Sequence, residues 1–186
     1  MLPAKNTTHD TIDWLPAERL GQFSVDPQVR SWLIGKGLLT QRLRAVCGER
    51  FTFRLADQST ALLDGAQKLY LRTTDLAALT RDVEMLCGDQ VWVFARTLMP
   101  DSTLSAHPWL AELGDSALGE TLNDLSGVER SSYEYAWLAS GNPLADRALA
   151  GRGGTPAGVW ARRSRIALRG APLLVQELFL PGMGGV

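Results

Sequence analysis

Alternation of apolar and polar residues is clearest over residues 160–181, where it predicts two strands joined by a tight turn. Gly170-Ala171 divides the stretch, and glycine at the first position of a two-residue loop suits a type II′ hairpin turn. This turn would place Ser164 opposite Glu177. Because side chains alternate along a strand, one face combines apolar residues with that carboxylate. The face comprises Trp160, Arg162, Ser164, Ile166, Leu168, Leu173, Val175, Glu177 and Phe179.

Glu177 is therefore expected among apolar neighbours, where a carboxylate is seldom buried unless it is paired or has a functional role. One interpretation is a structural pair with Arg162 or with a backbone amide. The other is a carboxyl group that faces a ligand pocket. The alternation is compatible with both.

A second hairpin is predicted over residues 79–99, with Gly88-Asp89 as its turn. A regular two-residue turn pairs Arg81 with Arg96 across the strands. Arg81 shares its strand face with apolar residues, whereas the neighbouring acids point to the other face. The guanidinium is thus either buried along its stem and neutralised by a carboxylate, or it binds an anionic ligand.

Helix signals precede and separate these hairpins. Asp26-Pro27 predicts a helix start, with Asp as N-cap and Pro at the first position, and the helix should end near Gly35. A second helix is expected from about Thr40 to Gly48, with Leu43 and Val46 facing inward. Shorter helices are expected at 106–113 and 118–122, and further strands at 50–55, 69–72 and 131–138.

Two stretches lack a regular pattern. Residues 1–24 are expected to be irregular, and residues 140–158, rich in Gly, Pro and Ala, predict an inserted surface loop. No internal repeat or linker divides the chain. Its 186 residues therefore predict one domain, residues 1–186.

Composition excludes several classes of protein. The net charge of −1 gives no case for nucleic-acid binding, and no apolar run is long enough to span a membrane. Cys47 and Cys87 have no paired spacing, which predicts free thiols in a reducing, cytoplasmic compartment. His9 and His107 lack neighbouring ligands, so no metal site is expected. The sequence has no GxGxxG, Walker-type or GxSxG motif.

Four segments resemble the chorismate pyruvate-lyase family, in the right order and over most of the chain. They are WLIGKGLLTQRL (32–43), RTLMPDSTLS (96–105), LGDSALGETL (113–122) and WARRSRIALRGAPLLVQELFLP (160–181). The resemblance implies an α+β fold in which helices pack on a single antiparallel sheet and two flaps enclose an internal ligand site. It also implies a cytoplasmic, monomeric enzyme without cofactor or metal. Such an enzyme splits chorismate into 4-hydroxybenzoate and pyruvate at the start of ubiquinone biosynthesis.

The resemblance also assigns site residues. The ligand-contacting arginine of the family falls on Arg81, and its glutamate falls on Glu177. Two further contacts, through backbone groups, fall on Leu39 and Leu118. All four residues are expected to bind the substrate, and Arg81 and Glu177 are also expected to be catalytic, with Arg81 on a carboxylate and Glu177 on the ring hydroxyl.

The chain departs from the family pattern at three positions and in one length. Leu38 replaces a frequent Ser, Ala117 replaces a frequent Pro, and Asn123 replaces a frequent Phe. The stretch 140–158 is also longer than expected. These departures concern the flaps and product release more than the chemistry, because Arg81 and Glu177 are both present.

Two other interpretations stay open. Ligand-sensing domains of some bacterial transcription regulators share this fold and bind small molecules without catalysis. The absence of DNA-binding helices at the start of this chain counts against that alternative. The third interpretation is a structural or partner-binding α+β domain in which Arg81 and Glu177 only pair with core groups.

Overall fold

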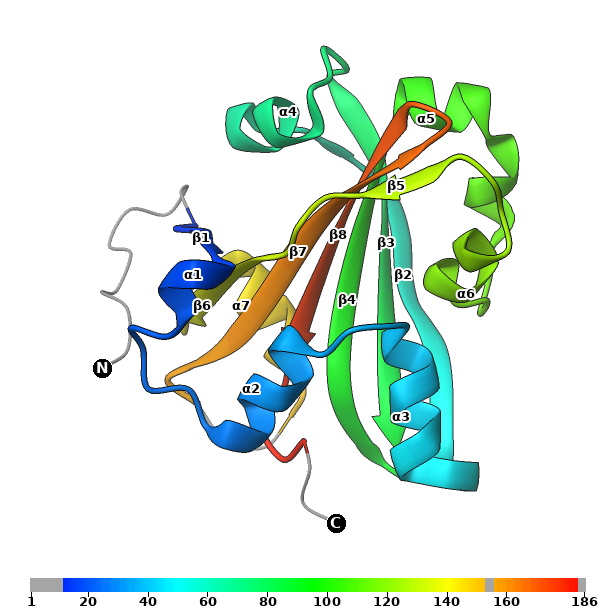
Figure 1. The fold of residues 1–186 in the computed structure, drawn as a ribbon. Helices are drawn as coiled ribbons and strands as arrows, with labels where there is room; N and C mark the ends of the chain where they lie inside the picture. Colours follow the sequence, from blue (N-terminus) through cyan, green and yellow to red (C-terminus); the bar gives the residue numbers. More distant parts are fainter. Residues whose placement is uncertain (1–11, 153–155, 184–186) are drawn as a thin grey trace.

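The computed structural model describes residues 12–152 and 156–183, which form one antiparallel sheet with helices on both faces (Figure 1). The strand order is β1-β6-β7-β8-β4-β3-β2, and β5 pairs with β7. This confirms the predicted α+β class. The strands are β1 (Leu15–Pro16), β2 (Phe51–Leu62), β3 (Ala77–Cys87), β4 (Gln90–Pro100), β5 (Val128–Arg130), β6 (Glu134–Ala139), β7 (Gly158–Leu168) and β8 (Ala171–Phe179). The helices are α1 (Ala17–Leu20), α2 (Pro27–Ile34), α3 (Leu39–Cys47), α4 (Gly65–Leu71), α5 (Asp101–Ala106), α6 (Leu118–Asn123) and α7 (Pro143–Leu149), with 3-10 turns η1 (Gly48–Arg50) and η2 (Pro108–Glu112).

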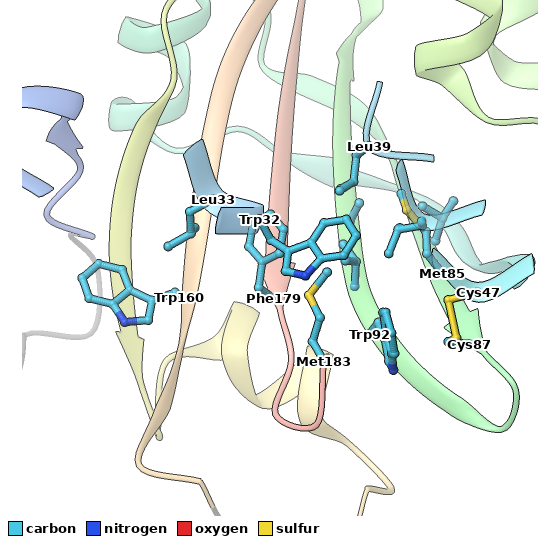
Figure 2. Close-up of a cluster of buried hydrophobic side chains, with 14 of the residues drawn as sticks. Trp32, Leu33, Leu39, Cys47, Met85, Cys87, Trp92, Trp160, Phe179 and Met183 are labelled. Carbon is cyan, nitrogen blue, oxygen red and sulfur yellow. A yellow bond between two sulfur atoms is a disulfide. The ribbon is translucent and has the colours of Figure 1, made fainter. Parts of the chain in front are cut away.

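The predicted start of α2 is confirmed. The Asp26 side chain accepts hydrogen bonds from the backbone N–H groups of Gln28, at 2.9 Å, and Val29, at 3.2 Å. These bonds satisfy two donors that have no partner within the helix. Trp32 and Leu33 are buried against the sheet, where Figure 2 shows them beside the other members of the largest apolar cluster.

Helix α3 ends at Cys47, and Gly48 follows at a positive φ of 59°. Leu43 is buried as predicted, but Val46 is 50% exposed, so its expected inward position is wrong. Cys47 occupies the inward position instead, one residue later. The buried residues Leu43 and Cys47 are four apart, as expected for one face of a helix with a 3.6-residue period. Val46 lies one residue outside that face.

The expectation of two free cysteines is wrong. A disulfide joins Cys47, at the end of α3, to Cys87, at the end of β3 (Figure 2). Both residues are buried in the same apolar cluster. Their separation of 40 residues carries no motif, and only the packing of α3 on the sheet brings the two Cα atoms to 5.5 Å.

Reduction of this disulfide is expected to lower the free energy of unfolding by up to about 4 kcal/mol, because the bond closes a loop of about 40 residues. Urea denaturation with and without dithiothreitol measures the difference. The Cys47→Ser/Cys87→Ser double variant is the control and should not respond to the reductant. Equal stability of the wild-type protein in both conditions would contradict the expectation.

The β3–β4 hairpin has the predicted turn but not the predicted register. Cys87 pairs with Gln90 around the Gly88-Asp89 turn, and the register then shifts by one residue between Met85 and Leu86. Such a β-bulge moves every later residue to a new partner. Arg81 therefore lies opposite Thr97, so the expected pairing of Arg81 with Arg96 is wrong.

Arg96 instead lies on the far face of the sheet. Its Nε and Nη2 donate to the two oxygens of Asp82 at 2.7 and 2.8 Å. Arg147 of α7 also pairs with Asp82, and Arg152 pairs with Glu84. These contacts explain how two acids can be buried on the face that points away from Arg81.

The expected surface loop at residues 140–158 is wrong for residues 143–149, which form α7. Asn142 caps this helix by accepting hydrogen bonds from the backbone N–H groups of Leu144 and Ala145. Leu144, Ala145 and Ala148 are buried against the far face of the sheet. The segment therefore adds a packed helix.

The β7–β8 hairpin turns one residue earlier than expected. Its turn residues are Arg169 and Gly170, with φ of 49° and 88°, as a type I′ turn requires. Arg162 consequently lies opposite Glu177, in place of the expected Ser164. The pairing changes by two residues, so the predicted strand faces are retained.

Three smaller predictions also change. Residues 69–71, expected in a strand, end α4, which Asp64 and Gln67 begin with a capping box. The expected helix at 106–113 starts earlier, as α5 followed by η2, whereas α6 lies as predicted. Residues 12–24 include β1 and α1; residues 1–11 lie outside the described part of the chain. No helix in the described ranges has the length and apolar character needed to cross a bilayer.

Candidate functional site

A cavity of about 400 Å³ lies between the sheet, the start of α3 and the start of α6, which is a usual size for a small-ligand site. All four sequence-predicted residues line it: Arg81 of β3, Glu177 of β8, Leu39 of α3 and Leu118 of α6. The sheet contributes mainly apolar and small side chains. Besides the four, the lining residues are Lys36, Gly37, Leu38, Thr40, Phe53, Val83, Met85, Ala95, Thr97, Ala117, Gly119, Asn123, Arg130, Tyr133, Ile166 and Val175.

Arg81 is almost fully buried in this wall, with 1% of its surface exposed. Its Nη2 donates to the backbone carbonyls of Gly114, at 2.6 Å, and Ser116, at 2.8 Å, in the loop before α6. Burial lowers the pKa of the guanidinium below its ordinary value, and the nearby Asp115 carboxylate partly offsets this effect. No group in the described residues accepts a hydrogen bond from Arg81 Nε.

Glu177 lies on the same sheet face and is 8% exposed. Its Oε2 accepts a short hydrogen bond from Nε of Arg162, the residue opposite it on β7. Burial disfavours the charge on Arg162, but the adjacent Glu177 carboxylate, together with Tyr133 and Tyr135, raises the pKa of Arg162 above its ordinary value. The structural pair and the pocket-facing carboxylate, posed as alternatives from the sequence, are both present.

Arg162 also connects Glu177 to the chain that covers the cavity. Its Nη1 lies within 3.0–3.3 Å of the carbonyls of Trp32, Leu33 and Gly35, at the end of α2. Carbonyls in the last helical turn have no partner within the helix, and a guanidinium satisfies them. Arg162 thereby joins the Glu177 carboxylate to the end of α2, from which the chain leads on to Leu39.

Two helix starts complete the cavity. Leu38 and Ala117 are the N-cap residues of α3 and α6, and neither accepts a hydrogen bond through its side chain. The first N–H groups of each helix, at Leu39 and Leu118, have no partner within the helix and can donate to a ligand. An Arg44–Glu120 ion pair of 3.4 Å links the two helices.

Sequence reasoning missed several lining residues, of which Arg130 and Tyr133 have the most distinctive chemistry. Arg130 ends the three-residue strand β5, and its Nη1 donates to Ser164 Oγ at 2.6 Å. The Tyr133 ring lies 4.3 Å from the Arg162 guanidinium. The short strand before Tyr133 had no alternation pattern, so no signal placed either residue at the site.

A second hollow, of about 940 Å³, lies on the opposite sheet face near α1 and α4 and contains none of the four predicted residues. There Arg163 stacks on Trp14 and Tyr70 and pairs with Glu134 at 2.7 Å, so its charge is already neutralised.

Within residues 12–152 and 156–183, no three His, Cys, Asp or Glu side chains gather as ligands. His107 contacts the Leu168 carbonyl at 3.2 Å, and His9 lies outside the described residues.

Solved structures share the fold. The C-terminal domain of the histidine utilization repressor from Pseudomonas syringae has a TM-score of 0.56 and 9% identity, covering 72% of this chain and 94% of that chain. The effector domain of PhnF from Mycobacterium smegmatis has a TM-score of 0.55 and 14% identity, covering 80% and 91%. At these identities the likeness concerns the fold alone.

Sequence relatives are far more similar. A probable chorismate pyruvate-lyase of Nitrosospira multiformis is 34% identical, with 92% of this chain and 94% of the relative covered. One of Methylococcus capsulatus is 39% identical, with 83% and 96% covered. The family model for chorismate lyase matches residues 8–183. With this match spanning nearly its whole length, and with the sheet and cavity described above, the chain belongs to the chorismate lyase family.

Proposed function

We propose that this protein is a chorismate pyruvate-lyase, which converts chorismate to 4-hydroxybenzoate and pyruvate. The observation that supports it best is the pair of buried, opposite charges on one cavity wall, Arg81 and Glu177. The Nε of Arg81 lacks a partner among the described residues. Buried donors are almost always hydrogen-bonded, so a ligand oxygen would complete this site.

The dimensions suit a ring with polar groups at opposite ends. Arg81 on β3 and Glu177 on β8 are two strands apart across the sheet and two residues apart along it. In a regular sheet this corresponds to roughly 12 Å between their Cα atoms. Both side chains line the cavity. Arg81 would bind the ring carboxylate, assisted by the N–H groups of Leu39 and Leu118, and Glu177 would bind the ring hydroxyl.

The chemistry requires orientation and exclusion of water more than strong acid–base groups. The ether bond between the ring and the enolpyruvyl oxygen breaks, and the ring carbon bearing the hydroxyl loses its hydrogen. The leaving group becomes pyruvate by gaining that proton on its methylene carbon, so the atoms balance. Aromatisation supplies the driving force, and a buried site that fixes the conformation of the ring lowers the barrier. Glu177 can accept the hydroxyl hydrogen bond throughout.

The remaining properties of the proposal follow from the family. We expect the protein to act as a monomer in the cytoplasm and to supply 4-hydroxybenzoate for ubiquinone biosynthesis.

A sensor of the same fold is the second candidate, favoured by the repressor domain and the PhnF effector domain among the structural neighbours. It would bind the same small molecules without converting them. The fold alone is compatible with both functions, whereas the identities of 34% and 39% to probable lyases favour the enzyme.

Variants of Glu177 test the proposal. Glu177→Ala should lower turnover of chorismate at least about tenfold, equivalent to about 1.4 kcal/mol in the barrier, because the ring hydroxyl loses its acceptor. Glu177→Gln should lose less if the role is hydrogen bonding, and as much if the carboxylate transfers the proton. Absorbance of 4-hydroxybenzoate gives the rates.

Glu134→Gln is a matched control, since Glu134 pairs with Arg163 on the neighbouring strand and does not line the cavity. It should retain wild-type turnover. Unchanged turnover in both Glu177 variants would make Glu177 a purely structural partner of Arg162.

A further inference from the structure

The proposed pair of Arg81 and Glu177 accounts for only one of the two carboxylates of chorismate. The product 4-hydroxybenzoate has one carboxylate and one hydroxyl, and this pair can bind both. The enolpyruvyl side chain carries a second carboxylate, which leaves with pyruvate. A site that binds the substrate needs a further cation, and this inference therefore rests on the proposed function.

Arg130 lines the cavity at the opposite side from Arg81. Ser164, Val175, Thr97 and Arg81 are successive partners across four neighbouring strands, so they form one row along the cavity wall. Arg130 Nη1 donates to Ser164 Oγ at 2.6 Å, at one end of that row. The two guanidinium groups thus lie at the two ends of the same row.

The charge of Arg130 is not neutralised within the described structure. None of the ion pairs found there includes Arg130, whereas Arg162 and Arg163 on the adjoining strand each pair with a glutamate. The neighbouring acid, Glu129, precedes Arg130 on β5 and so points to the other face of the strand.

The guanidinium of Arg130 is also held in place. Besides the bond to the buried Ser164 hydroxyl, it lies 5.7 Å from the centroid of the Tyr133 ring. Lys36 is another cation at the cavity, but no hydrogen bond or ion pair in the described residues fixes its ammonium group. A fixed guanidinium loses less conformational entropy on binding a carboxylate than a free lysine does.

We propose that Arg130 binds the carboxylate of the enolpyruvyl side chain and so distinguishes the dicarboxylate substrate from the monocarboxylate product. The side chain is attached to the ring carbon beside the hydroxyl. With the hydroxyl at Glu177, that carbon lies near the end of the cavity away from Arg81, and one orientation of the ring directs the side chain toward Arg130. Arg130 is exposed, so it can also release pyruvate to solvent once the ether bond has broken.

Arg130→Gln tests the assignment, because it removes the charge and keeps an N–H donor for Ser164. The variant should raise KM for chorismate at least about tenfold, as expected for loss of a charged contact. Its Kd for 4-hydroxybenzoate, measured by calorimetric titration, should change less than about twofold. Arg165→Gln is the control. Arg165 lies with Arg163 on the far face of β7, away from the cavity, so the same charge change there should alter neither value.

Equal losses for chorismate and 4-hydroxybenzoate, or no loss for either, would overturn the assignment. If the wild-type protein binds chorismate without converting it, the proposed function fails. The Arg130 assignment is then decided by the Kd of chorismate, which should rise in Arg130→Gln while that of 4-hydroxybenzoate stays constant. Failure of the wild-type protein to bind either compound would overturn both.

Discussion

Replacing Arg162 with methionine is expected to lower the free energy of unfolding by about 3–5 kcal/mol. Arg162 is 1% exposed, and the substitution leaves the buried Glu177 carboxylate without its partner. The carbonyls at the end of α2 lose their donor as well. Urea denaturation followed by circular dichroism gives the difference from wild type.

Two further variants are compared with Arg162→Met. Arg44→Met removes an ion pair whose members are 54% and 34% exposed, and it should cost no more than about 1 kcal/mol. The double variant Arg162→Met/Glu177→Gln should regain part of the loss, because an uncharged amide is cheaper to bury than an unpaired carboxylate. A loss no larger for Arg162→Met than for Arg44→Met would contradict the account of this buried pair.

Replacing Arg81 with alanine is expected to weaken binding of 4-hydroxybenzoate by about 2–5 kcal/mol, because the ligand carboxylate loses a buried, charged partner. Arg81→Lys keeps the charge but lacks the planar fork, so it should recover only part of the loss. Calorimetric titration of the three proteins measures both effects.

Arg54→Ala is the control for this experiment. Arg54 pairs with Glu84 on the far face of the sheet, and its side chain is 61% exposed. Its loss should leave ligand affinity unchanged. Equal affinity of wild type, Arg81→Ala and Arg81→Lys would remove Arg81 from the binding site.

The sequence predicted the parts of the fold that depend on local patterns. Strand alternation identified the faces of the β7–β8 hairpin and of β3, although not that of β4, and Asp26-Pro27 located the start of α2. Asn142-Pro143 is the same kind of signal and begins α7, but the surrounding Gly and Pro residues favoured a loop. Asp64 followed three residues later by Gln67 is likewise a local helix-start pattern, and it begins α4.

Features that depend on long-range packing had no local signal. The bulge between Met85 and Leu86 has no distinctive sequence, yet it moves Arg96 away from the site and pairs it with Asp82. The contact of Cys47 with Cys87 requires α3 to pack on the sheet. The resemblance to a known family supplied the four site residues that now line one cavity, whereas Arg130 is seen only once β5 is placed beside β7.

Incubation of the purified protein with chorismate tests the central claim most directly. Release of 4-hydroxybenzoate and pyruvate should be followed in the same sample, by chromatography and by coupling to lactate dehydrogenase. The account predicts that both compounds form in a one-to-one ratio, at a rate proportional to protein concentration and far above that of chorismate alone. Chorismate that binds to the protein but yields neither product faster than in buffer would contradict it, and would identify a binding domain in place of an enzyme.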